Sequence, residues 1–132
     1  MRKQLFILRR RILRAFEAKK GAGFEFSATP EGQLAEIIVL AQELVASGQD
    51  RSLPVEQRVF AYMPYMHSES ALVHVQAAVL FSQPGMEGNL DYELRHQAII
   101  NRFGRYPHRN AILGRTSTAE ELAFLSEPGS SF

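Results

Sequence analysis

Cysteine and tryptophan are both absent from this 132-residue chain. Without cysteine the chain can form no disulfide, and it offers neither a thiolate metal ligand nor a cysteine nucleophile. It also lacks any apolar run near the ~20 residues that a membrane-spanning helix requires. We therefore expect no membrane span. A cytoplasmic location, where thiols stay reduced, agrees with the missing cysteine.

Strand-type alternation of apolar and polar residues is missing too, and no exact internal repeat occurs at a spacing of 20–50 residues. Helical spacing of apolar residues recurs instead, in the stretches 2–20, 30–47, 55–64, 70–82, 91–104 and 118–125. The length suits one domain. The sequence therefore predicts a single all-α domain over residues 1–132, with about six helices in an antiparallel array, either a bundle or a stack of helix pairs.

Positive charge is concentrated at the beginning of the chain. Residues 1–20 hold eight lysines and arginines against one acid, Glu17, although the whole chain has a net charge of only +1. Apolar residues three and four apart in this stretch share one helix face. We predict a basic amphipathic helix that docks on its own chain, on a second chain or on a membrane surface. Nucleic-acid binding would depend on this segment alone, and we do not expect it.

Start and stop signals set the expected helix ends. Residues 29–31 (Thr-Pro-Glu) are typical of a helix start. Pro64 is expected to break the helix that precedes it, and Gly104 to end another. Pro107 predicts an extended connection. Residues 117–120 (Ser-Thr-Ala-Glu) match a capping box, in which Ser117 and Glu120 would bond each other's backbone.

The same spacing marks the apolar positions of two later helices. The helix over 70–82 runs through Leu72, Val75, Ala78 and Val79, and the helix over 91–104 has Leu94, Ala98, Ile99 and Phe103 on one side. His74 lies between two valines and is interpreted as a surface or partly buried histidine.

The first group of chemically useful residues is YMPYMHSES at 62–70. His67, Ser68 and Glu69 fall at a corner before a helix, where unpaired backbone amides and a partial positive charge occur. Two interpretations stay open: these side chains tie the corner together by hydrogen bonds, or they bind a ligand and transfer protons.

The second group is RFGRYPHRNAILGR at 102–115. Its arginines cannot lose their charge, so they need carboxylates, carbonyls, water or a bound anion. Few acids lie between Glu93 and Glu120, and partners must come from elsewhere in the fold, such as Glu69, or from a ligand. The candidate ligand-binding residues are Ser68, Arg102, Arg105, His108, Arg109 and Asn110.

The sequence gives less support to a metal site or to nucleophilic catalysis. His67, Glu69, His96 and His108 could ligate zinc or iron, but their spacing matches no metal signature. No nucleophile elbow and no phosphate-binding glycine loop is present. We predict no metal site and no cofactor.

Two long stretches, RVFAYMPYMHSES at 58–70 and RHQAIINRFGRYPHRNAILGRTSTAEELAFL at 95–125, closely resemble the bacterial domain-of-unknown-function family 924. Residues 29–40 and the ending EPGSSF also look like parts of this family, so the resemblance covers about residues 28–132. It implies an all-helical, tetratricopeptide-like fold. It points to the polar residues of both groups as matching positions, and it implies no established reaction or substrate.

The chain also departs from the family pattern. After Leu40 a central stretch with Asp-Gln-Phe and Arg-Asn elements is missing, and residues 1–20 do not resemble the family's aromatic-rich N-terminal part. The chain thus resembles a shortened member. A homodimer could form by exchange of the helix over 30–47 or through the N-terminal helix.

Three functions follow as hypotheses. The first is a helical module that binds a small anionic ligand or an acidic peptide through its His, Glu and Arg side chains. The second is an enzyme in which His67 or His108 acts as acid or base with Glu69, on an anionic substrate. The third is a purely structural or scaffold protein.

Overall fold

The computed structural model describes residues 30–131, with side chains from residue 35 onward. These residues form five α-helices and two short 3-10 helices, and this range contains no strand. In chain order the elements are α2 (Pro30–Ala46), η1 (Gln49–Ser52), α3 (Val55–Met66), α4 (Ala71–Leu80), α5 (Glu87–Phe103), η2 (Pro107–Arg109) and α6 (Ala119–Leu125). The all-α prediction is confirmed, whereas the helix predicted over 2–20 and the start signal at Thr29 lie outside the described residues.

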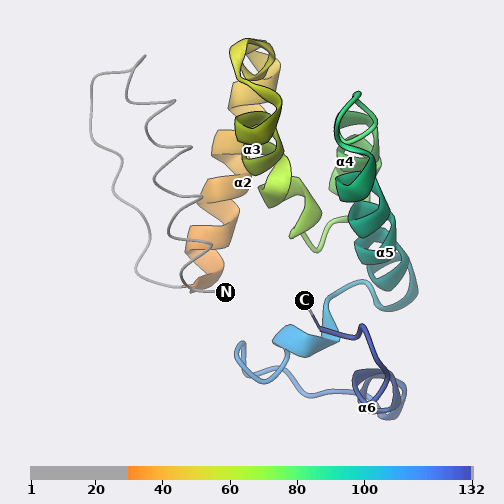
Figure 1. Ribbon diagram of the computed structural model, residues 1–132. Coiled ribbons are helices and arrows are strands. Elements are labelled where there is room, and N and C mark those ends of the chain that lie inside the picture. Colours follow the sequence, from red (N-terminus) through yellow and green to blue (C-terminus); the bar gives the residue numbers. More distant parts are fainter. Residues whose placement is uncertain (1–29, 132) are drawn as a thin grey trace.

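Helices that follow one another in the chain pack against each other (Figure 1). α2 lies beside α3, α4 lies beside α5, and α3 also contacts both α4 and α5. The short η2 contacts α6, and both lie beyond the end of α5. No helix within residues 30–131 is long and apolar enough to cross a membrane.

Buried apolar side chains hold these helices together. One group joins α2 to α3, a second joins α3 to α4 and to the start of α5, and a third joins the end of α5 to the segment before η2. The members of the third group are Ile99, Ile100 and Tyr106, with Phe103 and Phe124 packed against them. Tyr106 therefore fixes the η2 segment onto α5.

Pro64 does not end its helix as predicted. It lies inside α3, which continues to Met66, and His67 caps the helix with its backbone N–H bonded to the Met63 carbonyl. Proline lacks the backbone N–H that would bond the Phe60 carbonyl, and only Tyr65 and Met66 follow it in α3, so one hydrogen bond is lost near the end of the helix. The corner with His67 and Glu69 is nevertheless present.

α4 forms as predicted, but it does not bury the apolar residues that mark its helical spacing. Leu72 and Val79 are 80% and 70% exposed, and the buried positions on α4 are His74 and Ala77, continuing to Phe81. The same shift occurs on α5, where Leu94 is exposed while Glu93 and His96 are buried. A buried polar pair, His74 with Glu93, therefore occupies the place expected for apolar contacts.

Three boundaries also differ from expectation. α5 begins at Glu87, before the start expected at residue 91, and Pro107 starts the 3-10 helix η2 rather than an extended connection. The capping box lies one residue later than predicted, because Thr118 and Glu121 bond each other's backbone amides. Gly104 ends α5 as predicted, with a left-handed φ of 72° that favours glycine.

Candidate functional site

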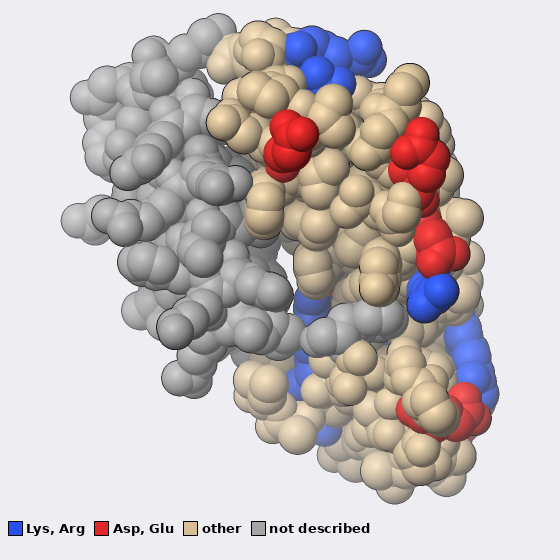
Figure 2. All heavy atoms as spheres, viewed as in Figure 1, with Lys and Arg blue, Asp and Glu red and all other residues tan. Residues whose placement is uncertain are grey.

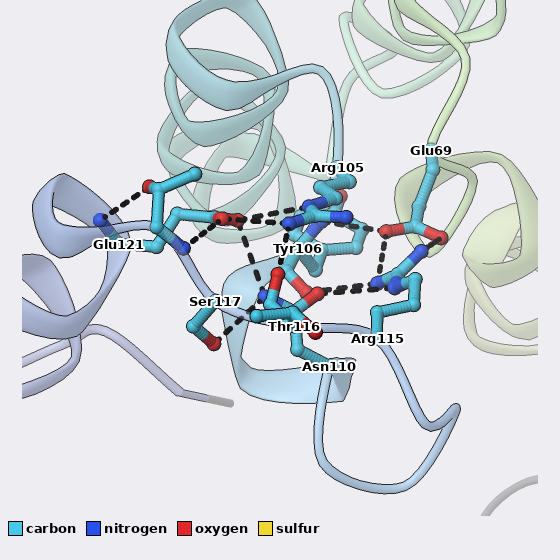
Figure 3. A network of polar contacts seen from close by, with 9 residues as sticks. Glu69, Arg105, Tyr106, Asn110, Arg115, Thr116, Ser117 and Glu121 are labelled. Carbon is cyan, nitrogen blue, oxygen red and sulfur yellow. Dashed lines mark hydrogen bonds and ion pairs between the residues drawn. The ribbon is translucent and has the colours of Figure 1, made fainter.

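The two polar groups predicted from the sequence meet in space, and Glu69 joins them (Figure 3). Its Oε2 accepts a 2.6 Å hydrogen bond from the backbone N–H of Tyr106. The guanidinium of Arg115 donates to both carboxylate oxygens, at 2.9 and 3.0 Å. The corner between α3 and α4 is therefore tied directly to the arginine-rich segment around η2.

These contacts decide the charge of Glu69. Burial alone would raise the pKa of its carboxyl, but the hydrogen bonds from Arg115 and from Tyr106 N–H outweigh burial and lower the pKa below its ordinary value. Glu69 is therefore an anion at neutral pH. Within the described part of the chain no histidine hydrogen-bonds its carboxylate.

A second ion pair lies beside the first. Arg105 donates to both oxygens of Glu121, at 2.9 and 2.7 Å, and also to the Thr116 carbonyl at 2.9 Å. The Arg105 hydrogen bond holds the pKa of Glu121 far below its usual range. Asn110 connects the two pairs, since its Nδ2 donates to Glu121 and its Oδ1 accepts from Arg115 (Figure 3).

Arg109 differs from these two arginines. It is only 6% exposed, its guanidinium carbon lies 4.7 Å from the ring centroid of Tyr106, and it forms no ion pair with any carboxylate of residues 35–131. Its buried Nε also has no hydrogen-bond partner among these residues. Burial is the main cause that lowers its pKa, although an arginine stays charged at physiological pH.

Buried hydrogen bonds link Tyr106 to His74 and to Glu93. Its hydroxyl donates to the Met66 carbonyl at 2.6 Å and lies 3.0 Å from Nε2 of His74. Nδ1 of His74 lies 2.5 Å from Oε1 of Glu93, and Nε2 donates to the Ser68 carbonyl at 2.6 Å. A contact that short between a ring nitrogen and a carboxylate oxygen requires a proton between them, so the pair is neutral overall.

The sequence interpretation missed His74, Glu93 and Tyr106. A signal was available, because His74 shares the 3-and-4 spacing of Ala77 and Phe81, and Glu93 shares that of His96 and Ile100. A polar residue on an otherwise buried stripe needs a buried partner. That rule would have directed attention to this pair.

Two more imidazoles lie beside the Tyr106 ring, and a third lies beside one of them. The ring centroids of His96 and His108 lie 5.7 and 5.5 Å from that of Tyr106, and His67 lies 5.6 Å from His96. Burial lowers the pKa of all three histidines, that of His96 to about 4. They are therefore neutral at pH 7 and offer N–H donors and lone pairs rather than charge.

Some predicted ligand-binding residues serve other contacts. Arg102 lies at the surface, where it pairs with Glu120 and stacks on the ring of Phe103. Ser68 is buried, and its hydroxyl accepts the backbone N–H of Ser70 at the corner. Within the described residues no three His, Asp or Glu side chains are arranged to hold a metal ion.

Figure 2 shows a few blue side chains in the part of this face that lies between the upper helices and the C-terminal region. Every blue residue there is an arginine, because residues 30–131 contain no lysine. The arrangement offers one buried guanidinium, three neutral imidazoles and an aromatic floor. These are groups that recognise an anion.

Comparisons with known proteins agree with the sequence resemblance. Residues 38–129 match the family described as "Bacterial protein of unknown function (DUF924)". A solved structure of a protein of unknown function from Agrobacterium tumefaciens is similar, with a TM-score of 0.67 and 34% sequence identity. The match covers 71% of this chain and 53% of that one, so the chain spans about half the length of the solved protein. The search of curated proteins found no match.

Proposed function

The chain belongs to the DUF924 family of bacterial proteins of unknown function, and on that premise we propose that its η2 region binds a small anionic ligand at Arg109. The observation that carries the proposal is a charge imbalance among buried groups. Arg105, Arg109 and Arg115 face two carboxylates, Glu69 and Glu121, and both carboxylates are held bidentately by the other two arginines. Among residues 35–131, Arg109 is therefore left without a carboxylate, and its charge can meet that of a ligand.

A buried charge without a partner is costly, because the protein interior replaces its hydration poorly. The fold nevertheless buries Arg109 to 6% exposure. Its cation–π contact with Tyr106 is worth only about 0.5–2 kcal/mol and leaves the in-plane N–H groups unused. A carboxylate or phosphate oxygen placed in that plane would accept charge-assisted hydrogen bonds.

The depth of Arg109 favours a small ligand over an acidic peptide, because a peptide would have to reach a nearly buried guanidinium through one side chain. The acid–base enzyme hypothesis has less support. It requires Glu69 to orient a histidine, whereas Glu69 is engaged by Arg115 and by Tyr106 N–H. A scaffold role without a ligand is the outcome that remains if no anion binds.

Isothermal titration calorimetry and thermal unfolding with inorganic phosphate, sulfate, acetate and nitrate test the proposal. We expect at least one anion to raise the melting temperature of the native chain by mass action. Arg109→Met should abolish that effect. Arg95→Met, which removes an exposed arginine paired with Asp91 on α5, should preserve it. Failure of every anion to bind, or equal binding by Arg109→Met, would refute the proposal.

A further inference from the structure

The outer face of α4 is apolar and exposed. Leu72 and Val79 are 80% and 70% exposed, and Val75 between them is 58% exposed. These three residues are three and four positions apart, so they share one face of the helix and form a stripe about 10 Å long. Exposed apolar residues of a monomer are normally scattered singly, whereas a continuous apolar patch marks an interaction site.

We propose that this α4 stripe, made of Leu72, Val75 and Val79, is a dimer contact on which α4 of a second copy of the chain packs. The contact is independent of the anion site. His74, which reaches the Tyr106 hydroxyl, is buried on the other face of α4.

The lack of charge on α4 favours a second copy over a charged partner. Between Ala71 and Leu80 there is no Lys, Arg, Asp or Glu, and Gln76 is the only exposed polar residue. In a twofold contact the same surface patch meets itself, so a charge on it would face its own copy. α4 avoids that repulsion, and the amide of Gln76 can both donate to and accept from the other copy. An acidic peptide, a basic segment or an anionic lipid surface would find no opposite charge here.

The size of the stripe predicts that the dimer is weak. A standard interface buries about 800 Å² on each partner and involves about 20–30 residues a side. α4 has only ten residues, and one face of it is buried within the chain. The dimer should therefore form at high protein concentration and dissociate on dilution. The similar solved protein is about twice as long as the part of it matched here, so two copies of this part together have about the length of that one protein.

The absence of cysteine allows the contact to be tested with one introduced thiol. Gln76 is exposed and lies at the middle of the stripe, so a twofold contact centred there brings it close to its own copy whether the two helices run parallel or antiparallel. Under mild oxidation Gln76→Cys should form a disulfide-linked dimer about tenfold faster than Leu122→Cys, because the contact raises the local thiol concentration. Leu122 is a matched control, since it is 60% exposed on α6. Equal rates would overturn the proposal.

Reversal of charge tests the same contact without a covalent bond. In sedimentation experiments from about 10 to 500 μM the native chain should shift from monomer towards dimer. Val75→Lys and Val75→Glu, at an exposed position that tolerates a charge in the monomer, should each stay monomeric, because like charges meet across the contact. A mixture of the two variants should form the dimer again, and Leu122→Lys should dimerise as the native chain does.

Other occupants of the stripe give different results, and each overturns the dimer. If residues 1–29 of the same chain cover it, the native chain stays monomeric and the Gln76→Cys thiol reacts slowly with a water-soluble reagent. If a different protein covers it, the chain stays monomeric and that thiol reacts as fast as the thiol of Leu122→Cys. A dimer that persists in Val75→Lys and in Val75→Glu uses another surface, such as the N-terminal segment or an exchanged helix.

Discussion

Replacing Arg109 by methionine is expected to stabilise the ligand-free protein. Methionine is of similar length and fills the same space over Tyr106 without a charge. Replacement of buried charged groups by apolar ones of similar volume is often neutral or stabilising by about 1–4 kcal/mol. The lost contact between the guanidinium and the Tyr106 ring offsets about 0.5–2 kcal/mol of that gain. The net expectation is roughly 1 kcal/mol of added stability.

Arg115→Met is the informative comparison, because it removes an arginine that has a partner. Arg115 and Glu69 are each 25% exposed, and the substitution leaves the Glu69 carboxylate with only the Tyr106 N–H as a donor. Breaking a fully buried ion pair costs about 3–5 kcal/mol. For this partly hydrated pair we expect a loss of about 2 kcal/mol. Arg95→Met, in an exposed pair with Asp91, should change stability by at most about 0.5 kcal/mol.

Urea unfolding at pH 7, in buffer without phosphate or sulfate, measures the three free energies of unfolding. In a thermal scan each 1 kcal/mol corresponds to a shift of roughly 3–5 °C for a domain of this size. The reasoning is refuted if Arg109→Met destabilises the protein as much as Arg115→Met does. In that case Arg109 would have a strong partner within the folded chain, and the charge reserved for an anion would not exist.

Three further predictions concern the helices around the site. Burial lowers the pKa of His96 to about 4, below its ordinary value of 6.5, so its neutral form contributes fully above pH 6.5. Roughly 2 kcal/mol should be lost as pH falls to 4.5, and urea titrations of His96→Gln at both pH values should lack this loss. Thr118→Ala removes the N-cap of α6 and should lower the free energy of unfolding by about 1 kcal/mol, whereas Ala119→Ser beside it should change it little. Gly104→Ala should cost about 1 kcal/mol through its left-handed φ of 72° alone, because no atom lies within 4 Å of an added Cβ; an unchanged unfolding curve would contradict this.

Helices were predictable from the sequence because caps and stops act locally. Gly48 and Gly104 end their helices in the left-handed conformation, and Ser70 caps α4, all near the expected positions. The face that α4 buries was not predictable from apolar spacing alone. Leu72, Val75 and Val79 form a stripe as regular as any in the chain, yet α4 turns His74 inward to meet Glu93. A tertiary polar contact overrides the local pattern there.

The sequence predicted the excess of arginines in the site, but it did not predict which carboxylate pairs with which arginine. Counting acids and bases in 93–120 showed that the arginines need distant partners, and Glu69 was correctly expected to supply one. Its partner turned out to be Arg115, 46 residues away, while Arg105 took Glu121 only 16 residues away. Which arginine pairs with which carboxylate depends on how the helices pack, and the spacing of residues in the sequence does not predict it.

Support for Arg109 comes from residues that carry no net charge. Its guanidinium lies on the Tyr106 ring. The Tyr106 hydroxyl donates to the Met66 carbonyl and lies beside His74, and His74 hydrogen-bonds Glu93. Because the His74–Glu93 pair has no net charge, it holds the Tyr106 ring in place without pairing with the positive charge of Arg109. Among the described residues, the His74–Glu93 pair thus contacts the ring that supports Arg109, while Arg109 itself has no carboxylate partner. This arrangement supports the anion site proposed here, because a neutral support for the ring leaves the charge of Arg109 available to a ligand.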